Sequence, residues 1–433
     1  MRLTWSRPVS ISKMYFSKLL CRAAWLALVV TSVTACGGGG SAPALNSVAS
    51  TPTLNNLPIP PAVSNALSVT VDAGPAGTGH NVNRLYTDVT ICYPGSTTQC
   101  QTIDHVLVDT GSMGLRLLSS AMAPALNLNR LTGGGLPLLN CAQFVDNRFA
   151  WGPVATADVV LGGKTATSVP IQIIADPAFD NPATACSVGG TAITTAATLG
   201  GNGIIGLGLF KEDCGASCTN ISNNGFYYTC TTASCTATTG AKASIAQQVK
   251  NPVPLFAADN NGVLIDLPAA SPADPSSLSG SLIFGIGTQS NNQMTSGGVL
   301  TTSSAGYITT LLAGQTLNTS LIDTGSNALY FDAGTIPTCA GGGGARFYCP
   351  SSRIILSTTL VGANALSIPV SFSIDNALGL FAGAPKAVLP TLSGPIGDAQ
   401  TVDWGLPFFY GRRVFSGIEG QASSLGTGPF YAF

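Results

Sequence analysis

The stretch Val106-Leu107-Val108-Asp109-Thr110-Gly111-Ser112 has a second copy later in the chain, Leu321-Ile322-Asp323-Thr324-Gly325-Ser326. Each copy begins with an apolar run typical of a buried strand and ends in Asp-Thr-Gly-Ser. The residues that follow also match, as Leu115-Arg116-Leu117 and Leu329-Tyr330-Phe331. A duplicated strand that ends in a tight glycine turn predicts two related lobes, which would bring Asp109 and Asp323 face to face.

The alternative is that both copies are ordinary Asp-Gly turns, which are common after strands. Such a turn needs Asp and Gly, but it does not need Thr and Ser repeated in both copies, nor two apolar strands leading into it. The repeat therefore favours a paired-carboxyl site over two unrelated turns.

Paired carboxyls have a definite chemistry. Two carboxyls in contact cannot both ionise at low cost, so the pair holds one proton. The ionised member can take a proton from a bound water, which then attacks a peptide carbonyl. The protonated member donates to the oxygen of that carbonyl. Gly111 and Gly325 would let backbone N–H groups approach the carboxyls without a Cβ clash. This chemistry requires no metal and no organic cofactor.

The composition excludes several classes of protein. The chain has 433 residues, of which 9% are charged and 45% hydrophobic, with a net charge of -1. A nucleic-acid-binding protein would show a basic face, and a disordered chain would be poorer in apolar residues. Because Lys, Glu and Arg are scarce, the composition favours strands and loops over surface helices.

The N-terminal sequence is typical of a targeting segment. Basic residues precede a short apolar stretch from Ala23 to Val33, and Val33-Thr34-Ala35-Cys36 follows. This is similar to a bacterial lipobox, in which the cysteine becomes the lipidated first residue; the alternative is an ordinary secretory signal with a chance cysteine. In Gram-negative lipoproteins a residue other than Asp directly after the lipidated cysteine usually implies the outer membrane, and here that residue is Gly37. We therefore expect a signal peptide over 1–36 and a flexible tether over 37–65, which is rich in Gly, Ser, Ala and Pro.

Ten further cysteines are expected to form disulfides in an oxidising compartment. Local spacing suggests Cys92 with Cys100 and Cys339 with Cys349, and a longer bridge between Cys141 and Cys186 is plausible. The pairing within the remaining group stays open, and a zinc site made only of cysteines is the alternative there. That group consists of Cys214, Cys218, Cys230 and Cys235.

Short strand-like runs fill the rest of the chain, beginning at Ala66–Val71, with Gly, Pro and Asn turns between them. Ser244–Lys250 is the clearest helical signal. We expect an N-terminal lobe over 66–268, with a Cys-rich insertion at 211–240, and a C-terminal lobe over 269–433.

These features together resemble the pepsin-like aspartic peptidases. The resemblance rests on both Asp-Thr-Gly-Ser copies and on the stretches Gly203–Gly208 and Trp404-Gly405, which are similar to the strands that thread behind the catalytic loops. It runs with gaps from about residue 66 to 433. The chain also resembles an exported bacterial lipoprotein family of unknown function with the same two motifs.

The resemblance implies a mostly β, bilobal fold of two barrel-like lobes with a cleft between them. It implies that Asp109 and Asp323 are catalytic, and that Thr110 and Thr324 tie the two loops together. Ser112 and Ser326 would orient the carboxyls.

The family's flap, a hairpin that covers the cleft, finds its best match in Trp151 and Gly152, with a tryptophan where tyrosine is usual. Arg116 occupies the position of the family's supporting tryptophan. The alternative for Trp151 is a half-buried hairpin aromatic.

The expected function is an envelope-anchored aspartic endopeptidase that acts on an extended polypeptide substrate. We expect a monomer held to the membrane through its N-terminal lipid. The alternative is a pepsin-like binding module that does not cleave its ligand, although both carboxyls are intact; a structural surface protein would leave the paired motifs unexplained.

Overall fold

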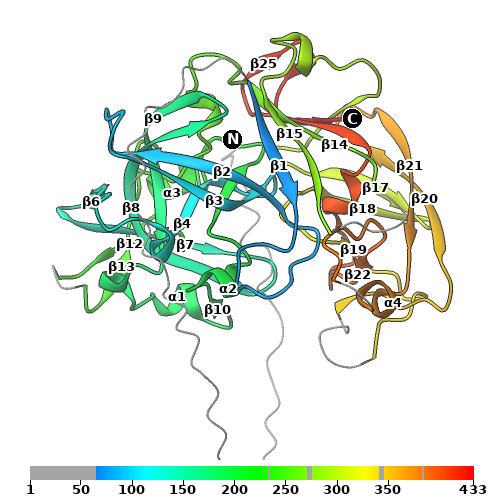
Figure 1. Ribbon diagram of the computed structural model, residues 1–433, viewed down its shortest axis with the longest axis horizontal. Coiled ribbons are helices and arrows are strands. Elements are labelled where there is room, and N and C mark those ends of the chain that lie inside the picture. Colours follow the sequence, from blue (N-terminus) through cyan, green and yellow to red (C-terminus); the bar gives the residue numbers. More distant parts are fainter. Residues whose placement is uncertain (1–64, 233–234, 271–275, 341–345, 383–384) are drawn as a thin grey trace, which may run out of the picture.

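The computed structural model describes residues 65–232, 235–270, 276–340, 346–382 and 385–433. Figure 1 shows a mostly β molecule, with the strands coloured blue to green on one side and those coloured yellow to orange on the other. The predicted signal peptide, Cys36 and residues 37–64 of the predicted tether lie outside the described residues.

In the described residues, the first lobe contains twelve consecutive strands and three short α-helices. Its strands are β2 (Leu85–Cys92), β3 (Cys100–Asp109), β4 (Met113–Leu118), β5 (Asn129–Arg130), β6 (Thr132–Gly133), β7 (Leu136–Gln143), β8 (Arg148–Leu161), β9 (Lys164–Ile174), β10 (Thr191–Ala192), β11 (Gly203–Leu207), β12 (Tyr227–Cys230) and β13 (Thr238–Gly240). Its helices are α1 (Thr184–Ser187), α2 (Ala196–Leu199) and α3 (Ala216–Asn220).

The second lobe is built around a 7-stranded sheet. The strands are β17 (Ile308–Leu312), β18 (Gln315–Ile322), β19 (Leu329–Phe331), β20 (Ile354–Val361), β21 (Ser367–Ile374), β22 (Ser393–Gly394) and β23 (Val402–Trp404), and α4 (Ala377–Phe381) follows β21. A small hairpin, β25 (Ala422–Ser423) with β26 (Gly426–Thr427), lies apart from it.

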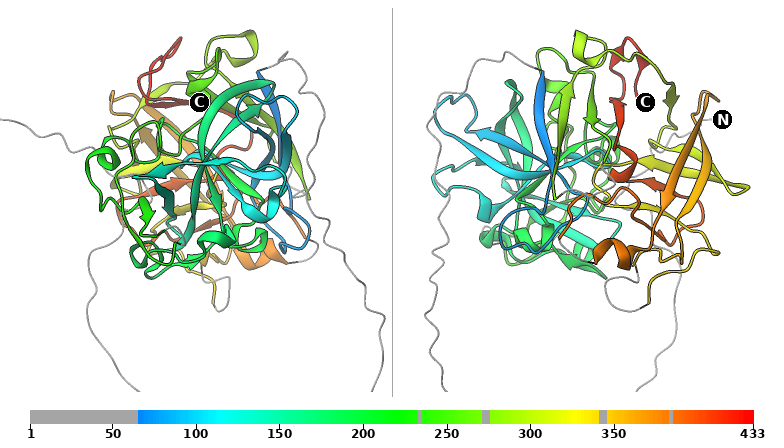
Figure 2. Two further views of the ribbon diagram at one scale, coloured as in Figure 1. Left: turned by 90° about the vertical axis from the view of Figure 1, so that its left-hand side faces the viewer. Right: turned by 45° about the vertical axis from the view of Figure 1, so that its right-hand side comes forward.

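A connecting sheet joins segments that are far apart in the sequence. Antiparallel pairings give the order β1–β15–β14–β24–β27–β16. These strands are β1 (Ala66–Val71), β14 (Gly262–Leu267), β15 (Leu278–Phe284), β16 (Val299–Thr301), β24 (Arg412–Gly417) and β27 (Phe430–Ala432). Figure 2 shows the two differently coloured halves side by side. The predicted lobe boundary after residue 268 falls between β14 and β15 and stays a prediction.

The two motif strands have the same surroundings. In the first lobe β11 lies between β3, to which it is parallel, and β4, to which it is antiparallel. In the second lobe β23 lies in the same way between β18 and β19. Gly206, within β11, and Gly405, directly after β23, lie where the backbones crowd. A Cβ on Gly206 would lie 2.5 Å from the Met113 nitrogen, and one on Gly405 would lie 2.2 Å from the Ala328 oxygen. Only glycine fits such approaches.

One apolar core supports both motifs. Leu115 and Ile205, beside the first motif, belong to the same buried cluster as Ile322 and Trp404, beside the second. Burial of large apolar side chains stabilises each by about 1.5–3 kcal/mol, so the core fixes the strands that deliver both loops. The predicted fold class, mostly β and bilobal in the pepsin-like manner, is confirmed.

Five disulfides confirm the expected cysteine chemistry. The suggested pairs Cys92–Cys100, Cys141–Cys186 and Cys339–Cys349 are all present. The open group pairs locally, as Cys214–Cys218 and Cys230–Cys235, so these four cysteines are not available as zinc ligands. Disulfides at this number are typical of an exported protein. No helix among the described residues is long and apolar enough to span a membrane.

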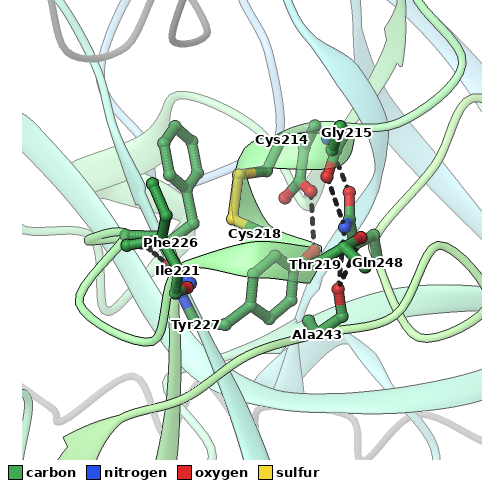
Figure 3. The surroundings of a disulfide bond; sticks show 12 residues. Cys214, Gly215, Cys218, Thr219, Ile221, Phe226, Tyr227, Ala243 and Gln248 are labelled. Atoms are coloured by element: carbon green, nitrogen blue, oxygen red, sulfur yellow. Dashed lines mark hydrogen bonds between the residues drawn. A yellow bond between two sulfur atoms is a disulfide. The ribbon is translucent and has the colours of Figure 1, made fainter. Parts of the chain in front are cut away.

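The predicted helix over Ser244–Lys250 is wrong, because the segment forms only a turn. Side chains satisfy its polar groups instead. Figure 3 shows Gln248 reaching the disulfide loop, where it accepts from the Gly215 N–H at 2.7 Å and donates to the Gly215 and Ala243 carbonyls. The Val249 N–H donates to the Tyr227 hydroxyl at 2.7 Å. Such side-chain bonds compete with helical ones and explain the outcome.

Candidate active site

The structure brings the two predicted carboxyls together. Asp109 ends β3, and Asp323 directly follows β18. A Cβ built on Gly111 would lie 2.6 Å from Asp323 Cγ, and one built on Gly325 would lie 2.6 Å from Asp109 Oδ1. The two carboxyls share a hydrogen bond, and each aspartate is only 8% exposed. One proton therefore lies between them.

Each carboxyl is held in the same way by its own loop. One oxygen accepts from the N–H of the glycine two residues on, and the other accepts from the hydroxyl of the serine three residues on. The contacts are Gly111 N to Asp109 Oδ1 at 2.8 Å, Ser112 Oγ to Asp109 Oδ2 at 2.5 Å, Gly325 N to Asp323 Oδ1 at 2.7 Å and Ser326 Oγ to Asp323 Oδ2 at 2.9 Å. These bonds fix the orientation of both carboxyls.

The motif threonines cross-link the two loops. The Thr110 N–H donates to Thr324 Oγ1 at 3.0 Å, and the Thr324 N–H donates to Thr110 Oγ1 at the same distance. Each hydroxyl in turn donates to a carbonyl of the opposite strand, Ile322 at 3.3 Å and Val108 at 2.7 Å. This reciprocal pattern fixes the two carboxyls relative to each other, since every bond in it crosses between the lobes.

The electrostatics of the pair are uneven. Burial, the negative charges of Asp109 and Asp403 and the shared hydrogen bond raise the pKa of Asp323 well above its usual range, while the Gly325 N–H opposes this. A raised pKa favours the protonated form. Asp323 is therefore the member that retains the shared proton in the resting pair.

The chain matches one family model and is similar to a solved structure. Residues 61–433 match the model of a family described as "Protein of unknown function (DUF3443)". The chain belongs to this family. Among solved structures, the aspartic proteinase from Irpex lacteus is similar at 12% sequence identity and a TM-score of 0.43, over 85% of this chain and 96% of that chain. A search of curated proteins finds no match.

The DUF3443 chain has a third carboxyl that the sequence reasoning missed. Asp403 lies in β23 and is 5% exposed, and its Oδ2 is within hydrogen-bond distance of Ser326 Oγ, at 2.5 Å. The signal was present in the sequence, because an aspartate in the apolar run before the threading Gly405 is out of place in a buried strand.

A segment before β2 also contacts the second Asp-Thr-Gly-Ser loop. Arg84 Nη1 donates to the Gly325 carbonyl at 3.0 Å. The buried Asn83 donates to the carbonyls of Asn327 and Leu389, both at 2.8 Å. No motif marked these residues, since their role depends on contacts across more than two hundred positions of the chain.

Arg116, at the position of the family's supporting tryptophan, has buried polar partners. It is 3% exposed and pairs with Asp213, with Nη2 and Oδ2 3.1 Å apart. It also donates to Asn140 at 2.6 Å and Gln172 at 2.9 Å. The position that follows the first motif therefore anchors a buried polar network inside the first lobe.

The predicted flap residues, Trp151 and Gly152, belong to the β7–β8 hairpin but not to its turn. Trp151 lies inside β8, is 5% exposed and donates from Nε1 to the Phe179 carbonyl at 2.8 Å. Position 152 requires glycine, because a Cβ at Gly152 would lie 1.8 Å from the Ile173 oxygen. Both residues thus serve strand packing. The turn of the same hairpin is 144–147, five residues or more before Gly152.

Substitution of the motif glycines tests the geometry without any assay of activity. Gly111→Ala and Gly325→Ala each place a Cβ against the opposing carboxyl. We expect each to lower the free energy of unfolding by about 1–3 kcal/mol, the usual cost of overpacking. Gly334→Ala is the control, because a Cβ there meets nothing within 4 Å. Denaturant unfolding of the three variants measures the effect, and a tolerated alanine at both motif positions would contradict the close approach of the loops.

Proposed function

We propose that this protein is an exported aspartic endopeptidase that hydrolyses peptide bonds with a water held between Asp109 and Asp323. The observation that carries the proposal is the contact between the two carboxyls, each only 8% exposed, with the shared hydrogen bond and matched loops. An isolated turn aspartate has no need of a second carboxyl placed against it. Burying two carboxyls together costs free energy, and such costly arrangements cluster at functional sites.

The mechanism follows from the uneven pair. Asp109, held by Gly111 and Ser112, takes a proton from the attacking water. Asp323, whose pKa is raised, donates its proton to the oxygen of the peptide carbonyl. The water oxygen bonds to the carbonyl carbon. When the tetrahedral intermediate collapses, the C–N bond breaks, Asp109 gives the proton it took from water to the leaving nitrogen, and Asp323 takes back the proton it had donated to the oxygen. The threonine cross-links hold the two carboxyls in place throughout, which lowers the entropic cost of the step.

The β7–β8 hairpin is the proposed cover for an extended substrate, through its turn 144–147 rather than through Trp151. Val145 in this turn is 61% exposed. The charge of Asp146 contributes to the raised pKa of Tyr330, after burial and alongside the charge of Asp403, so the turn lies near a second-lobe residue. Tyr330 donates to Asn327 Oδ1 at 2.6 Å, next to the second catalytic loop. A substrate strand would pair with the edge of this hairpin.

The proposed location is the cell envelope, with the protein acting as a monomer held by a lipid on Cys36, at the outer membrane. The support for export is the set of five disulfides. The support for the anchor is the lipobox-like Val33-Thr34-Ala35-Cys36 and the Gly-rich stretch that follows it. Metabolic labelling with a fatty acid, lost in Cys36→Ala, tests it.

Hydrolysis in water enriched in ¹⁸O tests the reaction. The purified protein is incubated with a mixture of denatured proteins from about pH 2 to about pH 8, with and without a statine-type inhibitor. Direct attack by water predicts new C-termini that carry one ¹⁸O from the first turnover, no transfer of the acyl part to an added amine, and inhibition by the statine.

No cleavage by the folded protein at any pH would overturn the proposal. In that case the binding-module alternative predicts that the intact dyad binds peptides and that Asp109→Asn retains the affinity, which calorimetry with any peptide retained on the immobilised protein would show.

A further inference from the structure

Asp403 occupies a position where the duplicated fold does not require a carboxyl. In the second lobe it pairs with Leu321 of β18 and Tyr330 of β19. The equivalent position in the first lobe is Ile204, which pairs with Leu107 of β3 and Arg116 of β4. Ile204 and Asp403 are both 5% exposed. An apolar residue therefore satisfies the same strand geometry, and the aspartate calls for another explanation.

The serine of the second motif lies between Asp403 and the dyad. Ser326 Oγ is 2.5 Å from Asp403 Oδ2 and 2.9 Å from Asp323 Oδ2. A hydroxyl has one hydrogen to donate. Both contacts can be hydrogen bonds only when one of the two carboxyls is protonated and donates to the serine oxygen. In the first lobe the corresponding Ser112 Oγ bonds to Asp109 Oδ2 at 2.5 Å, and the residue equivalent to Asp403 is the apolar Ile204.

The surroundings of Asp403 favour its protonated form. Its Oδ1 is buried and has no hydrogen-bond partner in the described part of the chain. A bare oxygen of an ionised carboxylate is expensive to bury. Burial raises the pKa of Asp403 to about 7; the charge of Asp109 acts in the same direction, and the Ser326 hydroxyl opposes them.

The titratable groups around Asp403 belong to four elements. Asp109 and Asp323 come from the two catalytic loops, Tyr330 from β19 and Tyr431 from β27. Burial raises the pKa of both tyrosines, so they remain neutral through the range in which carboxyls titrate. The charge on Asp403 is therefore felt chiefly by the dyad.

We propose that Asp403 is a positioning residue that controls, through Ser326, the hydrogen bond to Asp323. This inference rests on the proposed peptidase function of the dyad. When Asp403 is protonated, it donates to Ser326 Oγ, and the serine hydroxyl donates to Asp323 Oδ2. When Asp403 releases its proton to solvent, its carboxylate takes the serine hydrogen bond, and Asp323 loses the donor that orients it. The dyad thus has full support only below the pH at which Asp403 ionises.

Asp403→Asn separates this role from a structural one. The amide can still donate to Ser326 but cannot ionise. With a midpoint near 7 for Asp403, about a tenth of wild-type molecules stay protonated one pH unit higher. With each profile of kcat/KM against pH normalised to its own maximum, Asp403→Asn should retain roughly tenfold more activity than wild type at about pH 8. A decline at the same pH in both proteins would overturn the proposal.

Asp158→Asn is the matched control, because Asp158 is 6% exposed and accepts from the N–H groups of Gly95 and Ser168 in the first lobe. The same change of carboxyl to amide there should leave the pH profile like that of wild type. A shift equal to that of Asp403→Asn would show a general effect of losing a buried carboxyl and would also overturn the proposal.

A second readout does not depend on cleavage. With ¹³C-labelled aspartate carboxyls, NMR should show a carboxyl of the folded protein that titrates near pH 7, disappears in Asp403→Asn and persists in Asp158→Asn. Ser326→Ala should move that midpoint upward, because the serine bond stabilises the ionised form. Absence of this titration overturns the inference even if the protein is a peptidase. Absence of cleavage with the titration present overturns the proposed function instead.

Discussion

Asp323→Asn is expected to lower the rate of peptide cleavage by roughly 10²- to 10⁴-fold, the usual contribution of a general acid or base. An amide at this position cannot supply the proton that the carbonyl oxygen requires. The loops should stay in place, since the amide oxygen can still accept from Gly325 N–H and the threonine cross-links do not involve this side chain.

The same substitution should make the folded protein relatively more stable as the pH rises. Burial and the charge of Asp109 raise the pKa of Asp323 in the folded state. The stability that this group contributes is therefore fully present below the unfolded-state pKa and is lost as the pH rises through the folded-state pKa. Asparagine has no such loss. Urea unfolding at about pH 4 and about pH 7 should show a free-energy difference that moves in favour of the variant.

A cleavage defect that accompanies general unfolding would contradict this account, because the variant would then have failed for structural reasons. A variant that is well folded, inactive and relatively more stable at neutral pH fits a site whose function is kept at some cost in stability.

Arg116→Met is expected to be the most destabilising single change outside the dyad. It removes the partner of Asp213, which is 2% exposed and also accepts from the Tyr227 hydroxyl at 2.6 Å. Breaking a buried ion pair by deleting one partner costs about 3–5 kcal/mol, because the remaining charge is left without its counter-ion.

The loss should depend on pH. Burial already raises the pKa of Asp213, and Arg116 is the main influence that lowers it. Without the arginine the carboxyl of Asp213 stays protonated to higher pH in the folded state, so the destabilisation should be small near pH 4 and grow toward neutral pH. Urea unfolding at both pH values measures this.

Two controls frame the result. Asp213→Asn in the Arg116→Met background removes the orphaned carboxyl and should recover part of the lost stability. Arg353→Met breaks an ion pair whose arginine side chain is 61% exposed, where the expected cost is at most about 1 kcal/mol. Equal effects of Arg116→Met and Arg353→Met would show that the Arg116 network is not the anchor described above.

The sequence was most informative where a local pattern repeats. The two Asp-Thr-Gly-Ser copies predict strand, turn and the facing carboxyls, because the strand is apolar on both sides and the turn needs glycine. The close approach of Gly111 to Asp323 and of Gly325 to Asp109 confirms the expected juxtaposition. The local disulfides were predictable for a similar reason, since short spacings restrict the possible partners.

Features that depend on contacts between distant positions of the chain could not be predicted from local sequence patterns. The helix expected at Ser244–Lys250 yields to side-chain bonds from Gln248 and Tyr227, which no local pattern announces. Trp151 was matched to the family's flap, and the burial of its indole, whose Nε1 donates to the Phe179 carbonyl, was not predictable from the local sequence. Asp403 carried a local signal, as a carboxyl in an apolar strand, but its contact with Ser326, 77 positions away, could not be read from the sequence.

The most direct test of the central claim compares the wild-type protein with Asp109→Asn and Asp323→Asn on one mixture of denatured proteins, from acidic to neutral pH. The account predicts cleavage by the wild type and its loss in both variants, with all three proteins folded. Cleavage that survives in either variant would show that the facing carboxyls are not the catalyst.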